Sequence, residues 1–527
     1  MSVSRRPTFA LRPLLGAAVL AVSLGQPVYA QELPDMAQIE QAWQQGDFVT
    51  VRTGLKQLTE GTNDPIALYR YGRVLVEGRG GPRDVAGAVE ALEKAVAQNN
   101  TQAATLLARI VLSAKSLGGP TRAAGLFAGA AARGDHEAQY YLGLLYQSGK
   151  GVEQDDTAAF NWLLAASEGQ FLNAQWELSK AYANGTGTAQ NPQQALRWME
   201  ESATNGTPEA QYFLGVAYDQ GTAIARNPQT AVTWYRRAAE AGYVAAQRTL
   251  GTLYLEATHG QQANAAEAAR WLTAAADAGD IRAAHRLGVG YAAGSVLPKD
   301  AAKARVLFEG AALKEYPPAS FALGQLYQAG NGVPGDMQKA VTLYQRAAAQ
   351  GYKRAALHLG ALTSSGALDG VVGPQTTAAW AVIDLYETQN ADARDWLQRQ
   401  ADAGVRAAQA GLGGWLADQN GSETAGFGLL QQAAIAGDVP SQFRVGSMFT
   451  TGTGVDLDYV AAHTWLNIAA ASGHEEAADT RALISDLMTP DQVAEAQTAT
   501  RNYFDGAAAR APQTDQTEVT IKPSADQ

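Results

Sequence analysis

The sequence predicts an all-α fold, an α-solenoid of about eleven repeated helix pairs. First, a tyrosine recurs every 36 or 37 residues through the middle of the chain. Second, a glycine or serine stands three positions before each tyrosine, and third, a tryptophan recurs on the segment that follows. Repetition at a fixed spacing indicates units that stack on their neighbours. The tyrosines are Tyr146, Tyr182, Tyr218, Tyr254, Tyr291 and Tyr327; the small residues are Gly143, Ser179, Gly215, Gly251, Gly288 and Gly324; the tryptophans are Trp198, Trp234, Trp271, Trp396 and Trp465.

One unit, residues 208–243, shows why the repeats must stack. At helical spacing, its first half places Ala210, Leu214 and Tyr218 on one apolar stripe. Its second half does the same with Trp234 and Ala238, and a turn containing glycine and asparagine separates the halves. The unit is therefore predicted to be two antiparallel helices. Each has a face that it cannot bury alone, so copies must pack together.

The predicted helix ends carry residues that suit those positions. Asn227 and Pro228 match an N-cap followed by proline in the first helical position, and residues 191–192 repeat this pair. Gly242 follows the second helix where a left-handed residue commonly ends a helix, and Gly206, Gly279 and Gly351 take the same place in other units. Local chemistry therefore agrees with the repeat spacing.

The repeats divide the chain into segments. Residues 31–64 resemble half a unit, an N-terminal helical cap with Trp43, Phe48, Leu55 and Leu58 facing inward. The repeat array is expected over 65–365 and again over 392–473, separated by an insertion at 366–391. Residues 474–506 should form a C-terminal helical cap. Residues 507–527 are rich in Ala, Pro, Gln, Asp and Thr, which predicts a disordered tail.

Residues 1–30 have the anatomy of a secretory signal peptide. Arginines precede an apolar run at 14–24, and a small-x-small site ends at Ala30. A membrane helix is the alternative, but the run is shorter than the roughly 20 residues a span requires. We expect cleavage after Ala30 and a periplasmic protein, with secretion from the cell as second choice. No second long apolar run follows, so no membrane span is expected in the mature chain.

Composition excludes several classes of partner and cofactor. The chain has no cysteine, so disulfides and cysteine-ligated metals are excluded. Removing the leader and its three arginines changes the formal net charge from −11 to −14. Such an acidic chain is poorly suited to nucleic acid or an anionic membrane surface.

The repeat resembles the Sel1-like repeat, a relative of the tetratricopeptide repeat. The resemblance covers most of residues 65–473, although residues 101–135 lack the tyrosine and tryptophan and the turn at 258–260 is altered. It implies a right-handed superhelix of helix pairs in an exported bacterial adaptor. Family roles would include exopolysaccharide export, envelope signalling and host interaction. The match rests on Ala210, Leu214, Gly215, Tyr218, Ala231, Trp234, Tyr235, Ala238, Ala239 and Gly242, with the turns at 149–152 and 330–333.

The insertion carries a second resemblance. After residue 360 the second helix should begin near 375, yet the matching Ala-x-x-Trp appears at Ala393 and Trp396. The added residues resemble the core motif of peptidoglycan-binding modules, without the rest of that module. The alternative is a Gly-Pro loop that leads into a short helix. The motif residues, and thus the candidate glycan-binding residues, are Asp369, Gly370, Gly373, Pro374 and Thr377.

One position that recurs on the first helix of successive repeats, which we call the slot, is a candidate partner-binding surface. Tyr212 lies two positions after Ala210, about 200° around the helix at 100° per residue, and should leave the packed stripe. Exposed aromatic residues and arginine supply much of the binding energy in protein interfaces. The alternative is that these side chains pack against the preceding repeat. The residues in this slot are Tyr140, Trp176, Tyr212, Arg248, His285 and Phe321.

Three functions remain open from the sequence. The first is an exported, non-catalytic scaffold whose surface binds one or more envelope proteins. The second is a protein that binds peptidoglycan or an exopolysaccharide. The third, an enzyme, is disfavoured because the sequence lacks G-x-S-x-G, P-loop and H-E-x-x-H motifs. Gly330-x-Gly332-x-x-Gly335 lies between predicted helices, so it does not predict a nucleotide site. No cofactor, metal or catalytic residue is predicted.

Overall fold

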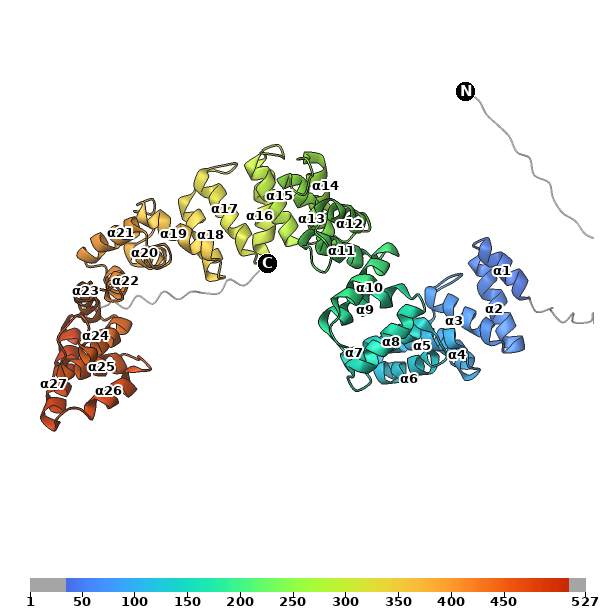
Figure 1. The fold of residues 1–527 in the computed structure, drawn as a ribbon, viewed down its shortest axis with the longest axis horizontal. Helices are drawn as coiled ribbons and strands as arrows, with labels where there is room; N and C mark the ends of the chain where they lie inside the picture. Colours follow the sequence, from blue (N-terminus) through green and yellow to red (C-terminus); the bar gives the residue numbers. More distant parts are fainter. Residues whose placement is uncertain (1–34, 511–527) are drawn as a thin grey trace, which may run out of the picture. The chain divides into compact units, whose positions relative to one another are not determined.

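The computed structural model describes residues 35–510, which fold into 27 α-helices and one short 3-10 helix (Figure 1). Within this range there are no strands, so the predicted all-α class is confirmed. The predicted signal peptide and residues 511–527 of the predicted tail lie outside the described residues. The chain divides into two compact units, Met1–Ala210 and Gln211–Gln527.

The first unit contains ten complete helices. They are α1 (Met36–Gln44), α2 (Phe48–Thr62), α3 (Pro65–Glu77), α4 (Val85–Ala97), α5 (Thr101–Ser113), α6 (Gly119–Ala131), α7 (His136–Ser148), α8 (Asp156–Glu168), α9 (Leu172–Asn184) and α10 (Pro192–Thr204), with the 3-10 helix at Lys115–Leu117. Helix α11 (Pro208–Gln220) begins at the unit boundary.

The second unit continues the series. Its helices are α12 (Pro228–Glu240), α13 (Val244–Glu256), α14 (Ala265–Asp277), α15 (Ile281–Ala293), α16 (Ala301–Leu313), α17 (Pro317–Ala329), α18 (Met337–Ala349), α19 (Lys353–Ser364), α20 (Pro374–Thr388), α21 (Ala391–Asp402), α22 (Arg406–Ala417), α23 (Glu423–Ile435), α24 (Val439–Thr451), α25 (Tyr459–Ala471), α26 (Ala477–Ser485) and α27 (Pro490–Arg510).

Helix pairs are the building block of both units. Most are two 13-residue helices, and each first helix packs chiefly on the second helix that follows it. The described residues contain eleven such pairs, from α3 and α4 to α24 and α25, as the sequence predicts. The predicted helix-capping residues are also present. Asn227 accepts a hydrogen bond from the Thr230 amide, and Gly242 has a φ of 86°.

The recurring small residue lets the two helices of a pair approach closely. A methyl group added at Gly324 would lie 2.5 Å from Cε1 of Tyr344, and one at Gly215 would lie 2.7 Å from the ring of Tyr235. The recurring tryptophans fill the core to different degrees. Trp198, Trp271 and Trp396 are buried, whereas Trp234 and Trp465 are half-buried.

Around the predicted insertion, the structure corrects the expected register. Helix α20 lies inside residues 366–391 and packs against α19 as the second helix of that repeat. Gly360 of α19 faces the backbone of Trp380 and the side chain of Asp384, so it plays the same role as the glycines in other pairs. The added element is instead α21, which carries Ala393 and Trp396 and packs against α20 and α22.

Both ends of the array are closed by helices. Leu55 and Leu58 are buried in the N-terminal cap as expected, but Trp43 and Phe48 are only half-buried and pack edge to face, 5.5 Å apart. At the other end, the Tyr503 hydroxyl of α27 donates to the Ala434 carbonyl, 3.1 Å away. Helix α27 continues to residue 510, so the predicted tail boundary at 507 lies four residues too early.

Candidate partner-binding surface

The expectation that the slot around Tyr212 forms an exposed row is wrong. Phe321 is only 4% exposed, and the other members are half-buried. They are Tyr140, Trp176, Tyr212, Arg248 and His285. The physical reason is that a first helix in a solenoid is packed on more than one side. A direction away from its main apolar stripe therefore still meets neighbouring protein.

Four of the five rings in this slot pack against the last residue of their own repeat, 31 positions later. Tyr140 lies 5.2 Å from Phe171, and Tyr212 lies 5.2 Å from Tyr243, between ring centroids. His285 and Tyr316 are 5.4 Å apart, and Phe321 and Tyr352 are 5.6 Å apart. Where the slot holds Arg248, the partner is the carboxylate of Asp280. Complementary pairs therefore close five of the repeats.

Burial also changes the acid–base properties of this slot. It raises the pKa of Tyr140 to about 12, and it lowers the pKa of His285 to about 4, with Arg286 adding to the second effect. Both groups are held neutral near pH 7. Because these half-buried neutral rings pack within their own repeats, they act as packing elements and not as a binding surface.

The glycan-like motif is built mainly as a loop and a helix start. Gly373 is the N-cap of α20, and Pro374 occupies its first position. The Thr377 hydroxyl is 2% exposed and donates to the Gly373 carbonyl. Leu368 is buried in the core of the preceding repeat. Of the five candidate glycan-binding residues, Thr377 is buried, and the other four, Asp369, Gly370, Gly373 and Pro374, are exposed.

A different feature, in the first unit, is the strongest candidate for a binding site. A pocket of about 470 Å³ lies over α1, α3, the turn after α3 and the start of α5, and we call it the N-terminal pocket. It is lined by Glu40, Trp43, Ile66, Tyr69, Arg70, Arg73, Arg79 and Gln102. A volume of this size suits a few side chains of a partner.

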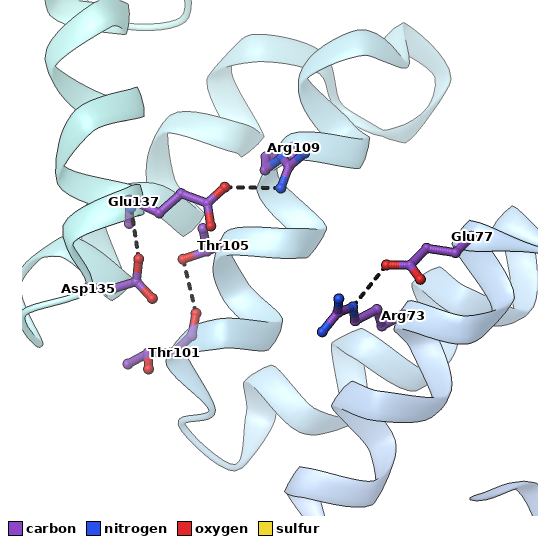
Figure 2. A network of polar contacts seen from close by, with 8 residues as sticks. Arg73, Glu77, Thr101, Thr105, Arg109, Asp135 and Glu137 are labelled. Atoms are coloured by element: carbon purple, nitrogen blue, oxygen red, sulfur yellow. Dashed lines mark hydrogen bonds and ion pairs between the residues drawn. The ribbon is translucent and has the colours of Figure 1, made fainter. Parts of the chain in front are cut away.

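Arginines hold the pocket's polar wall in place. The Glu77 carboxylate accepts a hydrogen bond from Nε of Arg73 at 2.8 Å and forms an ion pair with Arg79, whose Nε lies 2.6 Å away. Both guanidinium groups lie over the Trp43 ring, 5.7 and 5.6 Å from its centroid. Figure 2 shows Arg73 beside Glu77 on α3. One carboxylate and one indole thus fix two cationic side chains.

The surface formed by the first helices of the pairs continues beyond the pocket. Arg109 of α5 donates to Glu137 of α7 at 3.0 Å and lies 5.9 Å from the Tyr141 ring centroid (Figure 2). The combination of arginine, carboxylate and aromatic ring therefore appears again two helices along. Arg109 and Glu137 thus connect two successive first helices, α5 and α7.

Sequence reasoning missed the N-terminal pocket although a signal was present. A stretch of only ten residues contains Arg70, Arg73 and Arg79, although the chain as a whole is acidic. The helix pair that precedes this stretch contains Trp43. The sequence predicts that Trp43 faces inward in the N-terminal cap, because tryptophan on an apolar stripe is usually buried. The close approach of α1 to the end of α3 could not be derived from spacing alone.

The fold and surface define a helical repeat protein of the solenoid class. The Sel1 repeat family model matches eight segments, which together span more than half of the sequence. The chain therefore belongs to the Sel1 repeat family. The matched segments are 65–100, 136–171, 172–207, 208–243, 244–280, 281–316, 317–352 and 439–474.

One solved structure supports the same fold. The chain is similar to c5321, a protective antigen of uropathogenic Escherichia coli strains with an SLR fold, at 24% identity and a TM-score of 0.58; the match covers 90% of this chain and 99% of that chain. A Sel1 repeat protein from Oxalobacter formigenes is 27% identical with a TM-score of 0.44, covering 59% of this chain and 89% of that one. Comparison with curated proteins gives no match. Among the described helices, none combines the length and apolar character needed to cross a membrane.

Proposed function

We propose that this protein is an exported, non-catalytic scaffold that binds a protein partner in a process of the bacterial cell envelope. The observation that carries the proposal is the N-terminal pocket, where two arginines are fixed over Trp43 beside exposed Ile66. Arginine and aromatic residues in a preformed cleft are typical anchors of protein interfaces. Sel1 repeats, as stacked helix pairs, offer an extended surface on which such anchors are held rigidly.

The lining of the pocket favours binding over catalysis. It offers arginine, tyrosine, tryptophan, isoleucine, glutamine and one glutamate, Glu40, which is paired with Arg70 at 2.6 Å. None of the lining residues is a serine or histidine that could form a nucleophile and base pair. The acyl-transfer chemistry of such pairs is therefore not expected there.

Export is supported by the signal-peptide anatomy of residues 1–30. Periplasmic location follows as the first expectation, with secretion as second. Fractionation of expressing cells, followed by N-terminal sequencing, would test this step. We expect a periplasmic protein that starts at Gln31. An uncleaved protein in the cytoplasm would overturn the export part of the proposal.

Site-specific photo-crosslinking tests partner binding in the cell. A photo-reactive phenylalanine would replace Gln102 at the pocket, and the matched control would replace Leu313, which is 78% exposed on α16. We expect a discrete crosslinked protein at position 102 that is absent at position 313. The same products at both positions, or none at position 102, would contradict the proposal.

The alternative function, binding of peptidoglycan or exopolysaccharide, rests on the exposed Asp369–Gly370 segment. Deleting residues 366–391 is not a clean test, because it removes the whole of α20 and its packing on α19. The better test is co-sedimentation with peptidoglycan sacculi, comparing the protein with its Asp369→Asn variant. Pelleting that the substitution abolishes would favour this function. Equal sedimentation of the two proteins would count against it.

A further inference from the structure

We propose that the N-terminal pocket binds an acidic peptide segment of the partner, in which a carboxylate lies beside an apolar side chain. This inference rests on the proposed function and names the chemistry that the pocket selects. Three guanidinium groups, from Arg70, Arg73 and Arg79, are balanced by two carboxylates, those of Glu40 and Glu77. The pocket therefore carries an excess positive charge, although the chain as a whole is acidic at −11.

The geometry leaves donors for an incoming carboxylate. A guanidinium has five N–H donors, and Glu77 engages Arg73 and Arg79 through their Nε atoms. Arg73 and Arg79 both line the pocket, and planar guanidinium groups bind carboxylates through two parallel hydrogen bonds. Because the groups are already held over Trp43, a ligand orders little additional side chain on binding.

An apolar contact lies next to this charged wall. Ile66 is 53% exposed at the start of α3, and the half-buried rings of Trp43 and Tyr69 line the same pocket. A hydrophobic side chain of the ligand would cover this surface and displace water. The Gln102 amide at the edge can bond a peptide backbone. An acidic polysaccharide provides carboxylates but no comparable apolar group, so the pocket favours a peptide.

The rest of the molecule sharpens this selection. The net negative charge of the chain repels acidic partners elsewhere on its surface, whereas the pocket attracts them. Electrostatic complementarity of this kind fixes register and orientation more than it adds affinity. It also makes binding weaken as the salt concentration rises, because exposed charges are screened.

The experiment uses the full chain as bait for a displayed library of random 12-residue peptides. We expect selected peptides to be enriched in Asp or Glu next to Leu, Phe or Trp. A synthetic selected peptide is then compared, by fluorescence anisotropy, with its Asn and Gln counterpart. We expect the amide version to bind about tenfold more weakly or worse, and the acidic peptide to weaken with added salt.

Protein variants locate the binding. The double variant Arg73→Gln, Arg79→Gln should also weaken binding about tenfold. The matched control is Arg270→Gln, since Arg270 lies 4.3 Å from the Trp271 centroid and 3.6 Å from Glu267, but on the second helix α14. It should bind as the parent does. Thermal melting of each variant confirms that both remain folded.

The possible failures are distinguishable. Selection of neutral peptides that the double variant no longer binds would overturn the acidic-segment inference and leave the proposed function standing. Binding of polygalacturonate, a soluble polyuronate, with no peptide selected would overturn both. Equal loss of binding in the Arg270→Gln control would show that the pocket is not the site, which also overturns the inference.

Discussion

Replacing Gly324 by alanine tests the close helix packing on which the fold depends. The new methyl group would lie 2.5 Å from Cε1 and 2.8 Å from Cδ1 of Tyr344, well inside van der Waals contact. The ring has little room to move. It is fully buried, it packs 4.8 Å from His358, and its hydroxyl donates to Gln328 at 2.6 Å.

Two effects of opposite sign set the expected magnitude. Alanine in a helix interior is favoured over glycine by about 0.5–1 kcal/mol, because the unfolded chain loses less entropy. Overpacking of a core costs about 1–3 kcal/mol. We therefore expect Gly324→Ala to destabilise the packing of α17 on α18 by about 1–2 kcal/mol. The matched control is Gly310→Ala on α16, where an added methyl meets nothing within 4 Å, and it should stabilise by about 0.5–1 kcal/mol.

Hydrogen exchange with mass spectrometry is the suitable assay, because repeat proteins need not unfold in a single step. It reports the local opening free energy of each helix. Peptides from α17 and α18 should lose protection in Gly324→Ala, and peptides from α16 should gain it in Gly310→Ala. If both variants gained protection equally, the close approach at Gly324 would not exist, and the explanation of the recurring small residue would fail.

Three other expectations follow from contacts of single residues. Phe321→Ala should cost about 3–5 kcal/mol, seen as a large drop in melting temperature, because the ring is core and not surface; an unchanged melt would restore the exposed-row hypothesis. The pKa of His285 is lower in the folded protein than in the unfolded chain, so the unfolded chain binds more protons as the pH falls below 6.5. The contribution of His285 to stability is therefore full above pH 6.5 and falls toward about pH 4. His285→Phe should flatten this part of a stability–pH curve, and an identical curve would argue against the burial of His285. Tyr503→Phe removes the hydroxyl that links α27 to Ala434 and Gln442, and should destabilise the C-terminal cap by about 1 kcal/mol in denaturant titrations. No change would mean that other contacts of α27, such as the Asn467–Thr500 hydrogen bond, hold the helix without this hydroxyl.

Features with a fixed period were predictable from the sequence. The spacing of Tyr218 and its counterparts determined the helix pairs, and the position of Gly215 three residues earlier indicated the close contact with the next helix. Caps such as Asn227 followed from local chemistry. These features are repeated many times, so chance matches at single positions do not mislead.

Directions and non-local contacts were harder to predict. The angle of Tyr212 around the helix does not tell what lies in that direction, and in the structure Tyr212 packs against the core. A clue was nevertheless present, because aromatic residues at this slot are matched by aromatic residues 31 positions later, as with Tyr243, and Arg248 is matched by Asp280. The register of α20 and the N-terminal pocket depend on how particular helices pack, for which the repeat gives no rule.

The pairs that close five of the repeats have a consequence for how such a chain can change length. Tyr212 and Tyr243, or Phe321 and Tyr352, both lie within one matched segment, so a whole segment carries its own closing contact with it. Duplicating or removing a complete segment keeps every such pair intact. A cut elsewhere in the period separates them and leaves a large ring without its neighbour. The boundaries that the chain's side chains define are therefore natural sites for gain and loss of repeats, and engineered arrays should be joined there.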